Sequence, residues 1–313
     1  MDVAPFPVEG KSAIVTGAGS GINYCFARLL LSRGCSVLLA DLSLRPEAQS
    51  LIEQYSEIAS NKPRAVYVKT DVADWKQLQT MFEVADQEFG DVDIVCPGAG
   101  IFEPHWSNFW HPPGSEASRD QTSESRYALL DINITHPIRT TQMAIAYFLS
   151  PSRGAKVTRT HPKWIVHVSS IAGQNAGLPT PLYYASKHAI SGFVYSLASL
   201  EERLGIRVNG VAPGIIKTPL WTDHPEKSKL FDDSQDEWAT PEEVAEAMLA
   251  CIVDEDLPGG TILEVGKNHR RKVPLHNNPG PPNAPGLTVS DIQSGIDEVS
   301  RWLSRPGWGR SML

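Results

Sequence analysis

The chain has 313 residues, with 28 lysines and arginines against 36 aspartates and glutamates, which gives a formal net charge of −8 at pH 7. Hydrophobic residues make up 41% and charged residues 20%, a globular composition that excludes disorder throughout the chain or a collagen-like repeat. The acidic balance opposes binding to a phosphate backbone, so we do not expect nucleic acid as a partner.

The ends of the chain and its cysteines indicate a cytoplasmic protein. No apolar run approaches the roughly 18 residues of a membrane span, and the first ten residues lack the basic and apolar regions of a signal peptide. The four cysteines have no paired spacing, so we expect reduced thiols. The last three residues, Ser311, Met312 and Leu313, are similar to a peroxisomal address that lacks its basic residue, which leaves the peroxisome as an alternative location.

Short apolar runs rich in β-branched residues alternate with segments of helical period along most of the chain. The runs are Ser12–Thr16, Ser36–Asp41, Ala65–Asp71, Val92–Cys96, Trp164–Ser169, Ile206–Ala212 and Thr261–Val265. This alternation predicts βαβ crossovers and therefore a seven-stranded parallel sheet with helices on both faces, a doubly wound Rossmann-type α/β fold. We expect one domain over residues 1–268.

Two segments depart from this alternation. Residues 103–125 carry aromatic side chains, including Trp106, Phe109 and Trp110, within a stretch of Pro, Gly and polar residues, which predicts an inserted loop. Residues 269–313 form a C-terminal extension, in which five prolines between 274 and 285 disfavour regular structure. Apolar residues spaced by three and four then predict a short final helix over residues 291–304.

A glycine-rich loop, TGAGSGIN at residues 16–23, joins the first predicted strand to the first helix. Glycines at 17, 19 and 21 permit a tight turn and a close approach to a pyrophosphate, whose charge the helix N-terminus stabilises. A plain strand-to-helix turn is the alternative for the loop taken alone. Asp41 ends the second strand, where a carboxylate binds the ribose hydroxyls of NAD and repels the 2′-phosphate of NADP.

Tyr183 and Lys187 lie four residues apart at the start of a predicted helix and therefore share one face. A neighbouring ammonium favours the phenolate form, which makes a tyrosine usable as an acid or base near neutral pH. Tyr184 is the competing candidate, and an aromatic ring packed on a helix beside a solvated lysine is the structural alternative.

Ser170 lies at the carboxyl end of a predicted strand, where open α/β sheets bind ligands, and Asn133 lies in a helical segment after the fourth strand. Taken singly, a strand-end cap and a buried amide explain them. Together with Tyr183 and Lys187 they provide a proton donor, a cation, a hydroxyl to polarise a carbonyl and an amide to hold a water.

Over residues 8–266 the chain resembles the short-chain dehydrogenase/reductase family. The motifs occur in family order: Thr16-Gly17-x-x-x-Gly21-Ile22, Asp71-Val72, Ala99-Gly100, Asn133, Ser170, Tyr183-x-x-x-Lys187 and Pro213-Gly214. Within the family it is similar to NAD-linked secondary-alcohol dehydrogenases of the 15-hydroxyprostaglandin dehydrogenase type and to alcohol dehydrogenases of fungal secondary metabolism. The resemblance implies that Tyr183 is the catalytic acid/base, that Ser170 orients the substrate carbonyl, that Lys187 binds the nicotinamide ribose, and that Asn133 anchors a proton-relay water.

The resemblance also implies the residues that bind the cofactor, with Asp71 and Val72 at the adenine and Ile216 and Thr218 at the carboxamide. The full set is Gly17, Gly19, Ser20, Gly21, Ile22, Asp41, Asp71, Val72, Gly98, Ala99, Gly100, Tyr183, Lys187, Pro213, Gly214, Ile216 and Thr218. The sequence departs from the family at Asn23, which replaces a third glycine, at Pro97-Gly98, which replaces two asparagines, and in the long span before Asn133. We expect changed cofactor affinity from these departures rather than lost chemistry.

We therefore predict an NAD-dependent oxidoreductase that interconverts a secondary alcohol and a ketone on a bulky hydrophobic small molecule. Ser170, Tyr183, Trp106 and Trp110 are the expected substrate contacts, and residues 103–125 are expected to form a mobile lid unless their rings only pin the loop. An NADP(H)-dependent ketoreductase and a non-catalytic dinucleotide-binding scaffold or sensor are the alternatives. No metal is expected, because no two histidines have ligand spacing with a carboxylate. The family resemblance implies a homodimer or homotetramer.

Overall fold

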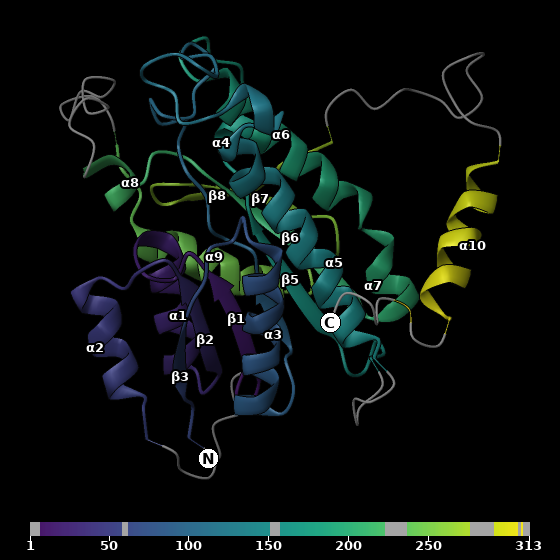
Figure 1. Ribbon diagram of the computed structural model, residues 1–313. Coiled ribbons are helices and arrows are strands. Elements are labelled where there is room, and N and C mark those ends of the chain that lie inside the picture. The colour runs from purple at the N-terminus through teal and green to yellow at the C-terminus, as the bar shows by residue number, and fades with distance from the viewer. Residues whose placement is uncertain are drawn as a thin grey trace.

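The computed structural model describes residues 7–57, 62–150, 157–222, 237–275, 291–305 and 308. Within these residues one sheet of eight strands runs in the order β3-β2-β1-β4-β5-β6-β7-β8 (Figure 1). The strands are β1 (Ser12–Thr16), β2 (Ser36–Asp41), β3 (Ala65–Lys69), β4 (Ile94–Cys96), β5 (Lys163–Val168), β6 (Ile206–Pro213), β7 (Ile262–Gly266) and β8 (His269–Lys272).

The doubly wound Rossmann-type fold is confirmed, with one difference in the number of strands. Strands β1 to β7 are parallel, as the sequence predicts. The eighth strand, β8, turns back after β7 and pairs with it in the antiparallel direction. Its four residues are exposed and polar, so hydrophobicity gives no signal for it. The sheet thus extends past residue 268, where the sequence analysis ends the domain, and the division of the chain there stays a prediction.

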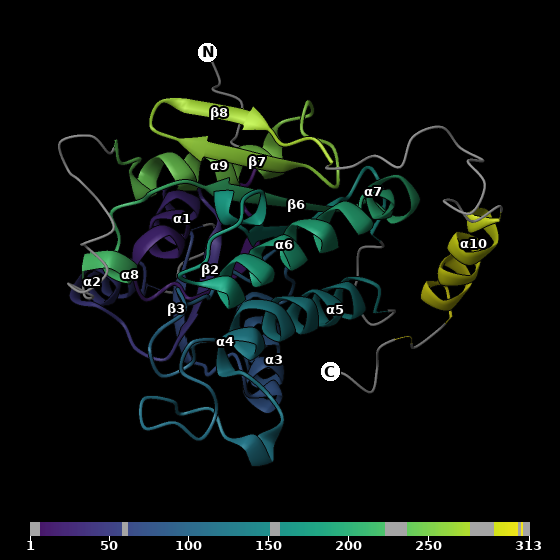
Figure 2. The same cartoon turned by 90° about the horizontal axis from the view of Figure 1, so that it is seen from above.

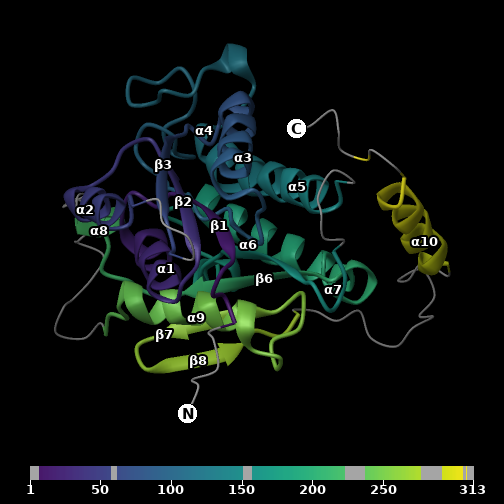
Figure 3. The same ribbon diagram turned by 90° about the horizontal axis from the view of Figure 1, so that it is seen from below.

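Helices cover both faces of the sheet (Figure 3). One face carries α1, α2 and α9, whereas the other carries α3, α5 and α6. The helices are α1 (Gly21–Ser32), α2 (Pro46–Gln54), α3 (Trp75–Phe89), α4 (Ala128–Leu130), α5 (His136–Phe148), α6 (Pro181–Ser196), α7 (Ser199–Leu204), α8 (Pro219–Thr222), α9 (Pro241–Val253) and α10 (Ile292–Leu303). No helix in the described part of the chain is long and apolar enough to cross a bilayer.

The strand sequences are continuously apolar because both sheet faces are buried. In β1, Ala13 and Val15 belong to the core under α1 and α9, while Ile14 between them belongs to the core under α3 and α5. In β2, Leu38 and Leu39 divide between the two cores in the same way. Alternate side chains of a strand point to opposite faces, so a strand covered on both sides needs an apolar residue at every position.

The order of the strands places a crevice beside β1. The chain places β2 and then β3 on one side of β1. It then crosses back to place β4 on the other side of β1, and β5 to β8 follow beyond β4. The loops that follow β1 and β4 therefore diverge, and ligands of open α/β sheets bind in the opening between them, at the carboxyl ends of the strands.

The insertion over residues 103–125 lies between β4 and α4 (Figure 2). A buried hydrogen bond of 2.8 Å joins the Ser107 hydroxyl to the Asp120 carboxylate, whose other oxygen accepts the N–H of Ala128 at 2.9 Å. Phe109 and Trp110 are about half exposed, at 49% and 52%. These hydrogen bonds thus hold the loop, and the rings of Phe109 and Trp110 stay in contact with solvent.

The predicted final helix is present as α10, which stands beside α7 (Figure 1). The Arg203 guanidinium of α7 donates a hydrogen bond of 3.0 Å to the Ser300 hydroxyl of α10. Leu303 packs against the core, whereas Ile292, Val299 and Trp302 are exposed.

The proline-rich segment from residue 276 and the last three residues lie outside the described residues, and the peroxisomal location is not borne out.

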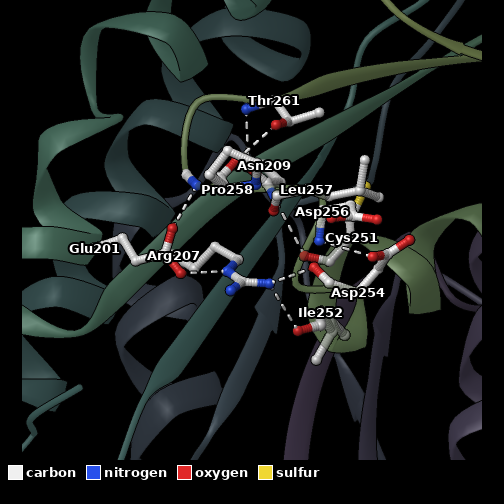
Figure 4. Close-up of polar contacts among 11 residues, drawn as sticks. Glu201, Arg207, Asn209, Cys251, Ile252, Asp254, Asp256, Leu257, Pro258 and Thr261 are labelled. Atoms are coloured by element: carbon white, nitrogen blue, oxygen red, sulfur yellow. Dashed lines mark hydrogen bonds and ion pairs between the residues drawn. The ribbon is translucent and has the colours of Figure 1, made fainter.

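A network of buried polar groups fixes the loop between α9 and β7 (Figure 4). The Asn209 side chain is fully buried, and its amide donates to the carbonyl oxygens of Cys251 and Leu257 at 3.1 and 2.9 Å. Its side-chain oxygen accepts the N–H of Thr261 at 2.9 Å. One buried side chain therefore satisfies three backbone groups, two of which belong to the buried residues Cys251 and Leu257.

We predict that Asn209→Leu, which has similar volume, lowers the free energy of unfolding by at least about 2 kcal/mol, because unsatisfied buried groups cost about 1–3 kcal/mol each. Urea unfolding followed by circular dichroism measures the change. Gln87→Leu, at an exposed amide on α3, is the matched control and should alter stability by less than about 0.5 kcal/mol. Equal stability losses in the two variants would contradict the role of the network.

Candidate active site

A cavity with a volume of about 610 Å³ lies at the carboxyl ends of the parallel strands. That volume is within the usual range for small-molecule and cofactor sites, about 300–1,000 Å³. Its wall combines the loops after β1, β4, β5 and β6 with the start of α6. The cavity therefore occupies the crevice that the strand order creates.

The glycine-rich loop forms one end of this cavity and fits a phosphate group. Gly17 and Gly21 have positive φ angles of 71° and 61°, which other residues rarely adopt. A Cβ at Gly19 would approach the Asp41 carboxylate oxygen to 2.8 Å, so only glycine fits there. Ser20 precedes α1 without a side-chain cap, and the first turn of α1 has no acidic residue. The helix N-terminus is thus able to receive an anion.

Asp41 lies at the end of β2 with its carboxylate beside the loop. Its Oδ2 accepts the N–H of Gly19 at 2.8 Å, and the side chain lines the cavity. Asp71 and Val72, which follow β3, line the same part of the cavity wall. These residues surround the position that the sequence analysis gives to the adenosine half of a dinucleotide.

Tyr183, Lys187 and Ser170 converge in the middle of the cavity. The Lys187 Nζ lies 5.4 Å from the centroid of the Tyr183 ring and donates to the Val168 carbonyl oxygen at 2.9 Å. The Ser170 side chain forms a hydrogen bond with the Tyr183 phenol. All three side chains line the cavity, which places a hydroxyl, a phenol and a buried ammonium around one point.

Burial controls the protonation of this group. It raises the pKa of Tyr183 to about 12, although the hydrogen bond from Ser170 acts in the opposite direction. Burial lowers the pKa of Lys187 to about 8. The spacing of Tyr183 and Lys187 predicts that the ammonium lowers the phenol pKa, but burial is the larger effect and raises it. The phenol is therefore protonated at neutral pH and ready to donate.

Asn133 lies just behind the cavity wall, in a π-helical turn over Asp131–Thr135. Its side-chain oxygen accepts the N–H of Ile101 at 2.9 Å, and its amide donates to the Ile101 carbonyl oxygen at 2.8 Å. The amide also lies 3.3 Å from the Ser186 hydroxyl on α6. Single π-turns inside helices are frequent at functional sites, and this one ties the loop after β4 to the helix of Tyr183.

Most of the predicted site residues line the cavity, and a few do not. The predicted catalytic and cofactor residues all line it except Gly19, which lies behind Asp41, and Asn133. Trp106 and Trp110 are not among the lining residues, and their contact with substrate stays a prediction. The side chain of Trp110 instead donates to the Leu178 carbonyl oxygen at 2.9 Å, which joins the insertion to the segment before α6.

Several lining residues were not predicted from the sequence. The Phe102 ring packs edge-on against the Tyr183 ring, with centroids 4.7 Å apart, and Tyr184 also reaches the cavity. Other unpredicted residues of the wall are Ile101, Ile132, Asn175, Pro179, Thr180, Ile215 and Leu220. Phe102 comes two residues after the Ala99-Gly100 motif, and this position is the sequence signal that could have identified it as a site residue. Tyr184, Ile132 and Leu220 lie in helical turns, and the others lie in loops whose path no sequence pattern fixes.

Comparison with known proteins identifies a family for most of the chain. The family model described as short chain dehydrogenase matches residues 11–229. The structure is also similar to a solved structure of 3-ketoacyl-(acyl-carrier-protein) reductase from Brucella melitensis complexed with NADH. The TM-score is 0.66 at 24% identity, over 83% of this chain and 98% of that chain. At that identity the likeness shows the fold alone.

Curated relatives are dehydrogenases and reductases. The chain is 32% identical over 218 residues to 15-hydroxyprostaglandin dehydrogenase [NAD(+)] of Rattus norvegicus, which covers 68% of this chain and 71% of that protein. It is 32% identical over 221 residues to the hydroxynaphthalene reductase-like protein Arp2 of Metarhizium guizhouense, with 69% and 72% covered. It is 30% identical over 214 residues to galactitol 2-dehydrogenase of Agrobacterium fabrum, with 68% and 73% covered.

Two of the departures from the family motifs, Asn23 and Gly98, lie against each other. A Cβ at Gly98 would meet the side-chain carbon and nitrogen of the Asn23 amide at 2.7 and 2.8 Å. The Asn23 side chain is buried at 8% exposure, and its oxygen has no hydrogen-bond partner in the described structure. An asparagine on α1 thus occupies the space in front of Gly98, in the loop that follows β4.

A second contact braces the end of β4 in place of the missing asparagine side chain. The Thr16 hydroxyl accepts the N–H of Ala99 at 3.1 Å and lies 3.1 Å from Nε2 of His136. Because Nδ1 of His136 lies 3.1 Å from the Ile132 carbonyl oxygen, Nδ1 carries the proton and Nε2 accepts from Thr16. Burial lowers the pKa of His136 to about 4, so the ring stays neutral.

We predict that Gly98→Ala lowers the free energy of unfolding by about 1–3 kcal/mol, the usual cost of overpacking, and that adding Asn23→Gly recovers part of the loss. A double-mutant cycle by urea unfolding of the ligand-free protein measures this coupling. Gly192→Ala is the control, because a Cβ on that exposed glycine of α6 meets nothing within 4 Å. Additive effects of the two substitutions would show that Asn23 and Gly98 are independent.

Proposed function

Because the chain belongs to the short-chain dehydrogenase family and is an oxidoreductase of alcohols and carbonyl compounds, we propose that it uses NAD to interconvert a secondary alcohol and a ketone on a bulky, largely apolar small molecule. One observation carries the proposal. The Tyr183 phenol, the Ser170 hydroxyl and the Lys187 ammonium line one cavity together with the glycine-rich loop. This set matches the requirements of proton transfer to and from an oxygen next to a dinucleotide site.

Each side chain has a separate task in the proposed reaction. When NAD(H) is bound, it supplies the hydride acceptor or donor. Ser170 donates a hydrogen bond to the reacting oxygen and polarises the carbonyl. Tyr183 gives its proton to that oxygen in ketone reduction and removes a proton from the hydroxyl in alcohol oxidation. Lys187, held by the Val168 carbonyl oxygen, keeps a cation beside the phenol and stabilises the phenolate when it forms.

The residues of the loop and of the strand ends provide the cofactor site. The N-terminus of α1 and the glycines at 17 and 21 would hold the pyrophosphate, and Asp41 would accept hydrogen bonds from ribose hydroxyls. A carboxylate next to a 2′-phosphate is a like-charge contact in a partly buried site, so we propose NAD rather than NADP. The relatives named for NAD(+) support this choice.

The apolar part of the wall supports a bulky hydrophobic substrate. Phe102 and Tyr184 flank Tyr183, and Ile132 and Leu220 add aliphatic surface. Removal of such surface from water is worth about 25 cal/mol per Å², so an apolar substrate gains affinity from these residues. Trp106 and Trp110 lie outside this wall, and we retain them as contacts for the distal part of a larger substrate.

The two alternatives predict different behaviour. An NADP(H)-dependent ketoreductase would need a cation where Asp41 stands, and Asp41 argues against it. A non-catalytic sensor would bind dinucleotide without turnover and would not need the buried Tyr183 phenol and its hydrogen bond to Ser170. We also propose a cytoplasmic homodimer or homotetramer, which size-exclusion chromatography with light scattering would identify.

We predict that Tyr183→Phe lowers kcat for benzhydrol and cyclohexanol oxidation by about 10²–10⁴-fold, the usual contribution of acid–base assistance, and leaves NADH affinity nearly unchanged. Initial rates of NADH formation and fluorescence titration measure the two effects. In the parent chain kcat/KM for oxidation should rise between about pH 6 and 8, because the raised pKa of Tyr183 keeps the base protonated at neutral pH while Lys187, with a pKa of about 8, still carries its charge.

Tyr195→Phe is the matched control, because Tyr195 is on the same helix and its hydroxyl donates to the Val273 carbonyl oxygen away from the cavity. It should retain the parent kcat. If Tyr184→Phe abolishes turnover while Tyr183→Phe does not, the assignment of the acid is wrong. If the parent chain binds NADH but oxidises no secondary alcohol, the sensor alternative is favoured.

We predict that the parent chain binds NADH at least about 100-fold more tightly than NADPH, and that Asp41→Asn narrows this ratio mainly by improving NADPH binding, because it removes the like charge. Fluorescence titration with both reduced cofactors measures the ratio. Glu53→Gln, at an exposed carboxylate on α2, is the control and should leave it unchanged. Equal affinity for the two cofactors in the parent chain would refute the choice of NAD.

A further inference from the structure

Glu103, the first residue of the insertion, is almost fully buried, with 2% of its surface exposed. Its Oε2 accepts the backbone N–H of Tyr183 at 2.9 Å, and its Oε1 accepts the backbone N–H of Phe109 at 3.0 Å. A third backbone N–H, that of Leu182, also hydrogen-bonds the carboxylate. One side chain thus joins the start of α6 to the middle of the insertion.

The start of α6 needs such a partner. The first N–H groups of a helix have no acceptor within the helix, and a side chain just before it usually supplies one. Thr180 precedes α6 but makes no side-chain cap, and Pro181 in the first position has no N–H. Leu182 and Tyr183 therefore present the first free donors, and Glu103 accepts both. A negative charge at a helix N-terminus is also favourable with respect to the helix dipole.

The residue before Glu103 acts on the same tyrosine. The Phe102 ring packs edge-on against the Tyr183 ring with centroids 4.7 Å apart, while Glu103 holds the Tyr183 backbone. Both the backbone and the ring of Tyr183 are consequently fixed by the segment that begins the insertion. Burial raises the pKa of the Glu103 carboxyl, and the three backbone N–H groups act in the opposite direction by stabilising the carboxylate.

We propose that Glu103 is a positioning residue for Tyr183, a cap supplied from outside α6 that couples the conformation of the insertion to the placement of the catalytic phenol. The inference rests on the proposed function of Tyr183. Since the same carboxylate holds Phe109, a change in the insertion on the substrate side is transmitted to the first turn of α6 through two hydrogen bonds.

Glu103→Gln is a specific probe, because it keeps the size of the side chain and replaces one oxygen by an NH₂ group. That group must face either the N–H of Phe109 or the N–H groups of α6, and donor then meets donor. Hydrogen–deuterium exchange of the ligand-free protein should show faster exchange in peptides 104–112 and 181–186, while a peptide from α1 keeps its parent rate. Glu116→Gln, at an exposed glutamate of the same insertion, is the matched control and should change neither peptide.

In turnover, Glu103→Gln should lower kcat for benzhydrol oxidation about tenfold, while KM changes less than about threefold. Rates are divided by the concentration of NADH-binding sites, so that unfolded protein does not lower the measured kcat. This corresponds to about 1.4 kcal/mol of transition-state stabilisation. Glu103→Asp keeps the charge with a shorter reach and should retain more of kcat than Glu103→Gln. Equal kcat losses in the Asp and Gln variants would contradict a role for the charge.

The decisive comparison combines Glu103→Gln with Tyr183→Phe. If Glu103 acts through Tyr183, the second substitution adds less than about twofold to the loss already caused by Tyr183→Phe. An additional tenfold loss of kcat when Glu103→Gln is added to Tyr183→Phe would overturn the proposal. A parent-level kcat in Glu103→Gln, with Tyr183→Phe inactive, would also overturn it. Parent-level activity in Tyr183→Phe, in contrast, would refute the proposed function itself.

Discussion

The burial of both faces of the sheet is the constraint on which the rest of this structure depends. Helices on each side require apolar residues at successive positions of the central strands, as the two cores that divide Ile14 from Val15 show. Polar side chains are then placed mainly where the strands end and the backbone turns. The candidate active site follows from this geometry, because the carboxyl ends of β1, β4, β5 and β6 open into one crevice.

Burial has a second effect inside that crevice, where it acts on charge. It raises the pKa of Tyr183 and lowers that of Lys187, so both groups shift toward their neutral forms. Ser170 and the Val168 carbonyl oxygen hold the two groups in place, which limits the reorganisation that proton transfer requires.

The sequence was sufficient to predict the fold and to identify side chains that meet at one cavity, because both depend on local patterns. Continuous apolar runs locate the parallel strands, and the spacing of Tyr183 and Lys187 places them on one helix face. The antiparallel β8 was missed because an exposed edge strand has no hydrophobic signature. Sequence patterns also fail to identify residues that contact the site from distant parts of the chain. Phe102 and Glu103 act on Tyr183 across 80 residues of chain, a contact that no periodicity reports.

The antiparallel β8 has a consequence for the solution behaviour of the protein. The edge of a sheet exposes unpaired backbone groups that can add a strand from another molecule. Here the terminal strand is short and consists of His269, Arg270, Arg271 and Lys272, all exposed. Arg271 pairs with Glu264 of β7 at 2.6 Å, which leaves an excess of positive charge along the rim. Two positively charged β8 strands repel each other, so this edge strand protects the otherwise apolar parallel sheet from edge-to-edge aggregation.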